Sequence, residues 1–241
     1  MARLYTSGSS EYVECPDRAG FDGSDGSIAC WFKTTQNTGG NLMRRDKGSG
    51  TLGVDRHWLM RIDGSKLSSL LIITGVPGVD SSGNYDDGAW HHGGMSWAWD
   101  GANTTLTLYA DGVSQGTNTS TMQFSSSAEN IYLGSQAGSS EFYSGDEAES
   151  AFWNVALTAA EFAALAKGYS PLLVRRSALA MYVPAVRNIV DMVWPTVTPS
   201  GTSVSTHPRM IYPRRRQIGV PAAASGVFGS YYYRLVAGMA G

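Results

Sequence analysis

The stretch DDGAWHHGGMSWAWDGANTTLTLYADGV, residues 86–113, decides the fold of this chain. Within it, residues 91–99 place Met95, Trp97 and Trp99 on one face, with Ser and Ala between them. Alternation with a period of two is typical of a β-strand that has one buried face. The stretch therefore predicts a strand whose large apolar side chains enter a core.

A second strand follows, because residues 104–110 alternate in the same way after the polar turn at residues 100–103. Asp111-Gly112 then supplies the positive φ that a tight hairpin requires. An antiparallel ribbon of two strands is marginally stable by itself. The rest of the chain must therefore contribute further strands.

These strands are predicted where apolar and β-branched residues lie between turn-forming residues. They are residues 4–14, 27–34, 41–45, 52–62, 66–74, 117–124, 130–134 and 149–154, with an exposed loop at 76–88. One helix begins at the capping box of Thr158 and Glu161 and ends at Gly168. Many short strands with a single short helix predict an all-β protein, a two-sheet antiparallel jelly-roll sandwich.

Composition agrees with a turn-rich β protein, since 29 of the 241 residues are Gly and only 16% are charged. No apolar run has the length of a membrane span, and the N-terminus lacks the apolar region of a secretory signal. Cys15 and Cys30 are too few for a disulfide framework, and Cys30 shares a strand face with apolar neighbours. We expect a buried free thiol there, and neither disulfide nor zinc is favoured.

The chain changes character near residue 170. Residues 1–170 hold 10 Lys and Arg against 19 Asp and Glu, whereas residues 171–241 hold 8 Arg and one acid, and seven of the nine prolines. The second part is too apolar for a disordered linker and too rich in Pro for a compact core. We predict a jelly-roll domain at 1–170 and an extended C-terminal arm at 171–241 that lies on another surface for anchoring or oligomerisation.

Six segments of the first part, in this order, resemble the laminin-G-like, concanavalin-A-like jelly rolls, a group that includes lectins, pentraxins and some glucanases. They are residues 11–14, 27–33, 87–92, 108–113, 131–134 and 145–154 followed by 156–158 and the capped helix. The resemblance implies the two-sheet fold. The chain departs from the family at Ala148, where an Asp usually precedes the acid that Glu149 matches.

The C-terminal residues 169–174 and 207–216 are similar to the tails of jelly-roll proteins encoded by tailed bacteriophages. This resemblance implies a virion component, assembled in the host cytoplasm and bound to capsid or tail subunits. Our first hypothesis is therefore a non-enzymatic virion structural protein, such as a capsid decoration or a head or tail surface protein, that forms a homo-oligomer.

Two acids near the end of the predicted domain are candidates for a glycosidase pair. Glu147 and Glu149 lie two residues apart, so a regular strand would place both on one face. Retaining glycosidases need two such carboxyl groups. In the glucanases of this superfold the strand carries Glu-x-Asp-x-x-Glu, but here Phe152 takes the last acidic position. A glycoside hydrolase is the third hypothesis, and we predict no catalytic residues.

The histidines and the loop acids are the candidate metal ligands of the sequence. His91 and His92 are adjacent on a strand and point to opposite faces, so a structural role is favoured over a shared metal. Calcium takes six to eight oxygens, and acids occur in several predicted loops, at Asp22, Asp25, Asp80, Asp86 and Asp87. No segment matches a compact calcium loop, so Ca²⁺ is left open and no other cofactor is predicted.

Two kinds of partner remain. The alternative function is a carbohydrate-binding adhesion module for host or mucosal glycans, for which Tyr109 is the candidate exposed ring, while Trp97 and Trp99 are assigned to the core. For anchoring to partner subunits we predict Arg214, Arg215, Arg216, Tyr231, Tyr232 and Tyr233. The basic patch is too small to favour nucleic acid. An acidic protein surface, on another subunit or on this jelly roll itself, suits it better.

Overall fold

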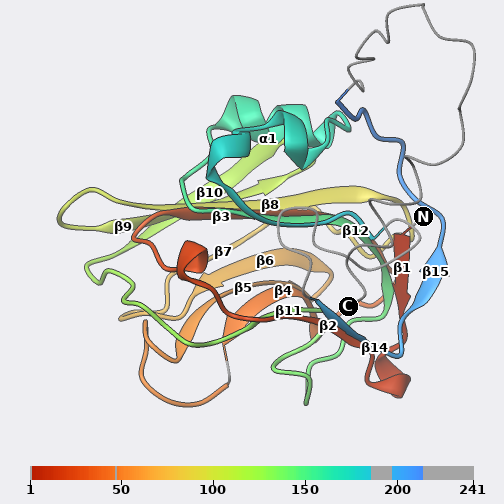
Figure 1. Cartoon of the computed structure of the whole chain (residues 1–241), viewed down its shortest axis with the longest axis horizontal. Coiled ribbons are helices and arrows are strands. Elements are labelled where there is room, and N and C mark those ends of the chain that lie inside the picture. The colour runs from red at the N-terminus through yellow and green to blue at the C-terminus, as the bar shows by residue number, and fades with distance from the viewer. Residues whose placement is uncertain (1, 47, 186–196, 214–241) are drawn as a thin grey trace, which may run out of the picture.

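A computed structural model describes residues 2–46, 48–185 and 197–213. The strands form two antiparallel sheets that pack face to face (Figure 1). Sheet A has the order β10 (Val113–Ser120), β9 (Thr104–Ala110), β8 (His91–Trp99), β3 (Gly26–Lys33), β12 (Gly145–Trp153), β1 (Ala2–Tyr5) and β15 (Ser203–Ser205), and β13 (Leu179–Val183) also pairs with β12. Sheet B has the order β14 (Thr198–Ser200), β2 (Tyr12–Cys15), β11 (Ile131–Leu133), β4 (Gly40–Asp46), β5 (Arg56–Asp63), β6 (Lys66–Leu71) and β7 (Gly78–Asp80). The predicted all-β sandwich is confirmed.

The ribbon at residues 86–113 forms as predicted. Strand β8 pairs with β9 through the polar turn at 100–103, and β9 pairs with β10. Asp111 and Gly112 have φ of 49° and 79°, the left-handed pair that a tight hairpin requires. Several boundaries differ from the prediction. β1 and β2 replace the single strand at 4–14 and lie in different sheets, and β7 lies within the predicted loop at 76–88. β10 begins at Val113 instead of residue 117, and β12 begins at Gly145 instead of residue 149.

The core between the sheets is built on large aromatic side chains. Trp97 is buried with its ring centroid 5.7 Å from that of Trp58 and 6.0 Å from that of Phe152. A Cβ at Gly26 would lie 2.3 Å from the Trp97 ring, so only glycine fits beside it. Cys15 and Cys30 are buried in the same core and form no disulfide.

The helix α1 (Ala159–Ala166) covers the outer face of sheet A (Figure 1). Thr158 and Glu161 make the predicted capping box, and Gly168 follows the helix with a φ of 88°. Phe162 is fully buried against the sheet, where a Cβ at Gly94 would come within 2.4 Å of its ring. A second apolar core therefore lies beneath the helix, outside the sandwich proper.

The described residues after 170 belong to the same sandwich, in contrast to the predicted arm on another surface. Two short 3-10 helices, at Pro171–Leu173 and Arg176–Ala178, lead into β13, which pairs with β12. Residues 197–213, here called the closing segment, contribute β14 to the edge of sheet B and β15 to the edge of sheet A. This packing corresponds to the alternative in which the C-terminal part lies on its own jelly roll.

Glu149 holds the closing segment in place. Its buried carboxyl group accepts hydrogen bonds from the hydroxyls of Tyr182 at 2.6 Å and Tyr212 at 2.7 Å, and Nε2 of His207 lies 3.1 Å away. Burial and the negative charge of Glu149 raise the pKa of both tyrosines well above the usual value. No helix in the described part of the chain has the length and apolar character that a membrane crossing requires.

Candidate functional site

Charged and aromatic side chains form a band across the outer face of sheet B. We call it the polar strip and define it as Tyr12, Glu14, Tyr132, Arg44, Glu141, Arg61 and Asp63. These residues lie on β2, β11, β4 and β5, and Glu141 belongs to the loop between β11 and β12. The register places Glu14 beside Tyr132, and Tyr132 beside Arg44. On β5 the register places Arg61 beside Asn41 of β4, so the strip crosses four neighbouring strands obliquely.

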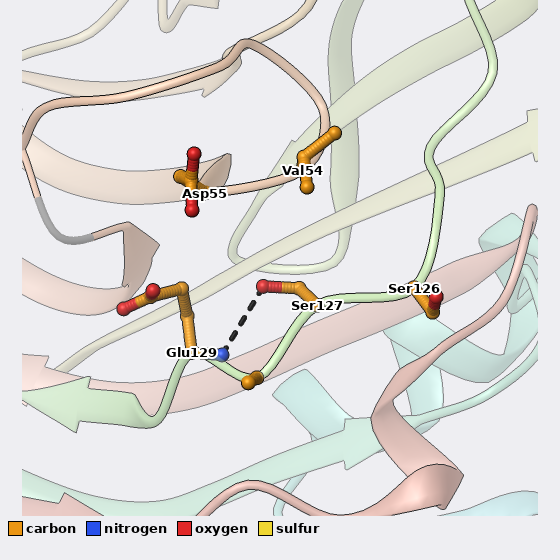
Figure 2. Close-up of a pocket in the computed structure, with 6 residues that line it drawn as sticks. Val54, Asp55, Ser126, Ser127 and Glu129 are labelled. Carbon is orange, nitrogen blue, oxygen red and sulfur yellow. Dashed lines mark hydrogen bonds between the residues drawn. The ribbon is translucent and has the colours of Figure 1, made fainter.

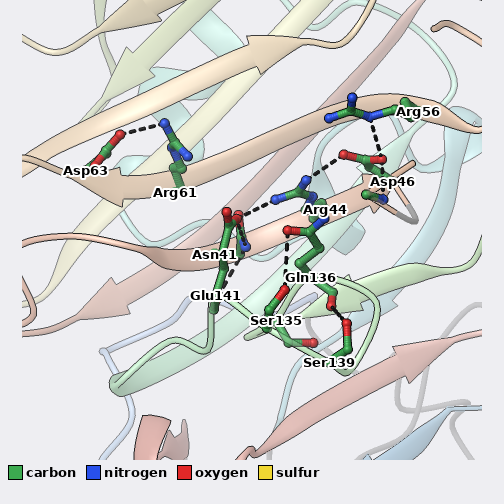
Figure 3. A network of polar contacts seen from close by, with 12 residues as sticks. Asn41, Arg44, Asp46, Arg56, Arg61, Asp63, Ser135, Gln136, Ser139 and Glu141 are labelled. Carbon is green, nitrogen blue, oxygen red and sulfur yellow. Dashed lines mark hydrogen bonds and ion pairs between the residues drawn. The ribbon is translucent and has the colours of Figure 1, made fainter. Parts of the chain in front are cut away.

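Arg44 forms the centre of the strip and is held from two sides (Figure 3). Its guanidinium donates to Asp46 Oδ2 at 2.6 Å and to Glu141 Oε2 at 2.5 Å, and only 4% of the side chain is exposed. The amide nitrogen of Asn41 donates to the same Glu141 oxygen at 2.9 Å. These contacts fix the positions of Arg44 and Glu141 before any ligand arrives.

Other members of the strip reach solvent. Arg61 donates to Asp63 Oδ2 at 2.5 Å, and the two side chains are 25% and 40% exposed (Figure 3). Glu141 is exposed to a similar degree as Asp63. Arg56, also partly exposed, lies 3.2 Å from Asp46. The exposed part of the strip thus offers guanidinium donors and carboxylate acceptors side by side.

Two half-buried tyrosines extend the strip towards β2. The ring centroids of Tyr12 and Tyr132 are 6.1 Å apart, and the amide of Asn130 donates to Glu14 beside them. Burial raises the pKa of Tyr132, with Glu14 adding to the effect. Aromatic rings next to paired carboxylates and guanidiniums suit ligands that have both C–H faces and hydroxyl groups, since rings supply apolar contact area and the polar pairs supply donors and acceptors.

A pocket of about 410 Å³ lies between two loops at one end of the sandwich (Figure 2). It is lined by Val54 and Asp55 on one loop and by residues 126–129 on the other. Within the second loop, the backbone nitrogen of Glu129 donates to the hydroxyl of Ser127 at 3.1 Å. The lining combines two acidic side chains, Asp55 and Glu129, with serines and with the apolar Val54 and Ala128.

A buried arginine ties the second of these loops to residues 17–22 from the inside. Arg45 is fully buried and pairs with Asp17 at 2.7 Å and Asp22 at 2.9 Å. It also donates to the carbonyl oxygens of Phe21, Ser127 and Glu129 at 2.6, 2.9 and 3.0 Å. Five oxygens that would suit a cation thus already surround a guanidinium.

Most of the loop acids considered for calcium have partners within the protein. Asp22 pairs with Arg45, Asp25 accepts from the backbone of Trp99, and Asp86 accepts from Ser65. Among the described residues, no three His, Cys, Asp or Glu side chains are grouped so that they could hold a metal ion. The residues present therefore do not fit a calcium site.

Glu147 and Glu149 do not share a face, which corrects the prediction made from their spacing. Strand β12 has a bulge between Ala148 and Ala151, and Glu149 has a φ of 58°. The extra residue reverses the alternation. Glu147 points into the core, where it accepts from Ser150 at 2.6 Å and burial raises its pKa to about 8. Glu149 points outwards to the closing segment, so the two acids form no glycosidase pair.

The side chains of the two histidines lie on opposite faces of β8, as predicted. His92 is buried edge-on to Trp31, and burial lowers its pKa to about 4. His91 lies between Asp111 at 2.8 Å and Asp87 at 3.1 Å. Burial opposes its protonation, but the hydrogen bonds to both aspartates outweigh burial and raise its pKa. Each histidine is therefore held by contacts within the fold.

The prediction that Tyr109 is an exposed ring available to a sugar is wrong. Tyr109 is only 7% exposed and stacks on Phe162, with ring centroids 4.1 Å apart. The strand pattern correctly put Tyr109 on the face opposite Leu108, but helix α1 covers that face. Trp97 is in the core as predicted, whereas Trp99 is half-buried at the end of β8.

Sequence reasoning missed the polar strip. Its signal was present on β5, where Arg61 and Asp63 alternate with Met60 and Ile62 of the core. The predicted anchoring residues lie outside the described residues: Arg214, Arg215, Arg216, Tyr231, Tyr232 and Tyr233.

Several solved structures share this fold. A protein from Bacteroides ovatus that is proposed to bind carbohydrate has a TM-score of 0.65 at 14% identity over 86% of this chain, and this chain spans 60% of its length. The heptameric SAP-like pentraxin of Limulus polyphemus has a TM-score of 0.57 at 13% identity, over 86% of this chain and 95% of the pentraxin. The CBM40 of the Ruminococcus gnavus IT-sialidase, bound to α2,3-sialyllactose, has a TM-score of 0.51 at 16% identity, over 69% and 97% of the two chains.

No curated protein matches this sequence significantly. A family model does match residues 7–163, which span both sheets from the start of β2 into helix α1. The chain belongs to the Laminin_G_3 family of the concanavalin A-like lectin/glucanases superfamily.

Proposed function

We propose that this protein is a non-enzymatic carbohydrate-binding module that uses the polar strip on sheet B. The observation that carries the proposal is the fixed arrangement of Arg44 and Glu141 next to the exposed pair Arg61–Asp63. A sugar hydroxyl both donates and accepts, so adjacent carboxylate and guanidinium groups can satisfy it completely. Preorganised side chains lose little conformational entropy on binding.

The location of the strip supports the same function. Helix α1 covers much of the outer face of sheet A, whereas Arg61, Asp63 and Glu141 on sheet B are accessible. The strip spans four neighbouring strands, which are about 4.8 Å apart. It is therefore long enough for several sugar units laid across the strands. Two of the proteins with this fold are described as carbohydrate-binding, which agrees with the proposal.

A glycan array probed with the full chain tests the function, and affinity electrophoresis in gels that contain the bound polysaccharide tests the site. We expect Arg61→Ala and Tyr132→Ala each to weaken binding about tenfold or more, which corresponds to about 1.4 kcal/mol. Thr117→Ala, an exposed position on β10, is the matched control and should bind normally. Normal binding by both strip variants would disprove the site, and an array without any bound glycan would disprove the function.

Absence of hydrolysis is part of the proposal, since Glu147 and Glu149 lie on opposite faces of β12. We expect no release of reducing sugar from any polysaccharide that the protein binds. Hydrolysis that Glu147→Gln abolishes would contradict this expectation.

The virion role stays a separate prediction. It depended on an arm that leaves the jelly roll, but residues 197–213 close the edges of both sheets. The residues predicted to contact capsid or tail subunits lie beyond Pro213, outside the described residues. Binding of the full chain, but not of a chain that ends at Pro213, to phage particles would support that role.

A further inference from the structure

A second pocket, of about 250 Å³, lies on sheet A where β3 ends and β12 begins. Asp146 pairs in register with Lys33 on one side and with Leu4 on the other. Phe32 and Glu147 point into the core, so alternation directs Lys33 and Asp146 to the outer face. The pocket is thus on the opposite side of the sandwich from the polar strip.

The acid in this pocket has an unused acceptor. The side chain of Asp146 is 8% exposed, and its Oδ2 lies 3.5 Å from Nζ of Lys33. Its Oδ1 is buried without a hydrogen-bond partner among the described residues. The protein thus satisfies the carboxylate only in part, through the contact with Lys33, and the carboxylate retains acceptor capacity for a ligand group that donates a hydrogen bond.

The remaining walls are already fixed by the protein. Thr34 donates to the carbonyl oxygen of Ser144 at 2.5 Å and accepts from the backbone of Gln36 at 2.8 Å. Thr35 is exposed at the rim, and the partly exposed Leu4 adds an apolar wall. The pocket therefore combines a rigid frame with one free acceptor, one ammonium donor and one apolar side.

The charges of the pocket select a class of ligand. Lys33 and Asp146 cancel one another, so an anion would meet the free carboxylate oxygen and a cation would meet the ammonium group. A hydroxyl group can donate to the Asp146 carboxylate and accept from Lys33 Nζ, and a neighbouring hydroxyl can reach Thr35. The C–H face of a sugar ring would then contact Leu4. The volume suits a single ring.

We propose that this Lys33–Asp146 pocket is a second binding site, specific for a neutral polyhydroxylated ligand the size of one sugar residue. The ligand class rests on the proposed carbohydrate-binding function, but the location does not, because the polar strip lies on the other sheet.

Saturation-transfer NMR on the full chain tests the pocket, with neutral methyl glycosides of glucose, galactose, mannose and fucose as probes. N-acetylneuraminic acid serves as the anionic probe and glucosamine as the cationic probe. We expect at least one neutral glycoside to bind, and Asp146→Asn and Lys33→Met each to weaken that binding at least fivefold. Thr117→Ala is the control, and thermal unfolding of every variant verifies that it folds.

Each other result overturns the proposal. If no neutral glycoside binds, or if both variants bind it as wild type does, the pocket is not a site. If only the anionic probe binds and needs Lys33 alone, or only the cationic probe binds and needs Asp146 alone, the ligand class is wrong. Arg61→Ala separates the two proposals, because it should weaken oligosaccharide binding at the polar strip about tenfold or more and leave glycoside binding at the Lys33–Asp146 pocket intact.

Discussion

The outer faces of the two sheets differ in what covers them. On sheet A, Tyr109 is stacked on Phe162 of helix α1, and the closing segment is fastened to Glu149. On sheet B, Arg61 and Asp63 pair with one another and remain partly exposed. Burial of apolar side chains contributes far more to stability than exposed ion pairs do. The part of sheet A beneath helix α1 and the closing segment is therefore built for stability, whereas the polar strip on sheet B is available for recognition.

The largest loss of stability should follow when helix α1 loses its packing on sheet A. Phe162→Ala removes the ring that packs on Tyr109 and beside Gly94. We expect the free energy of unfolding to fall by about 3–5 kcal/mol, the usual cost of a buried Phe→Ala change. Urea denaturation followed by tryptophan fluorescence measures it, with Lys167→Ala as the control. A loss below about 1 kcal/mol would show that the helix is not part of the core.

The fastening of the closing segment should give the next largest effect. Glu149→Gln leaves the hydroxyls of Tyr182 and Tyr212 with a weaker acceptor. Hydrogen bonds to charged groups are worth about 1.5–3 kcal/mol each, so we expect a loss of about 3 kcal/mol. Limited proteolysis should also cut the variant near residues 197–213 faster than the wild type. Unchanged cleavage would argue against the fastening role.

Buried titratable side chains should make the free energy of unfolding depend on pH. The pKa of Glu147 rises from its usual 4.5 to about 8, so the folded state holds a proton that the unfolded state releases. Stability should fall by up to about 1.4 kcal/mol per pH unit as pH rises through this window. The pKa values of His57 and His92 fall to about 4 through burial, so their contribution is lost as pH falls below 6.5.

Together these groups predict a stability maximum near pH 6.5. His91, whose pKa is raised, also loses its contribution as pH rises above that point, to a smaller extent because it is partly exposed. Glu147→Gln should therefore remove most of the decline between pH 6.5 and 8, about 2 kcal/mol in all. Thermal unfolding across this range checks the prediction, and an identical decline in the variant would refute it.

The smallest effect on stability is expected on sheet B. Arg61→Ala breaks an exposed pair with Asp63, and such pairs contribute about 0–1 kcal/mol. The same substitution should weaken glycan binding at the polar strip about tenfold or more. A variant that lost several kcal/mol of stability instead would show that the polar strip is a structural network, and the contrast between the two faces would disappear.

Rules that depend on residues close together in the sequence predicted much of the fold. The strands of the ribbon, the hairpin at Asp111-Gly112 and the capped helix all formed where their residues indicated. Each of these depends on interactions between residues close in sequence, so spacing is sufficient to identify them.

The candidate site could not be read in this way. The polar strip joins Tyr12, Arg44, Tyr132 and Arg61 from four strands far apart in the sequence, and only sheet order makes them neighbours. Tyr109 followed its strand pattern, but the helix that covers it arrives some fifty residues later. Exposure depends on such distant elements.

The class of fold, the ribbon, the helix and the burial of Cys30 could be predicted from the residues alone, because hydrophobic period and turn chemistry are local. The tertiary structure alone decided that a bulge separates Glu147 from Glu149, that Arg45 occupies the oxygen-rich centre of the loops, and that the segment after residue 196 closes both sheets. These depend on register and on contacts between distant residues, which the order of residues along one strand does not specify.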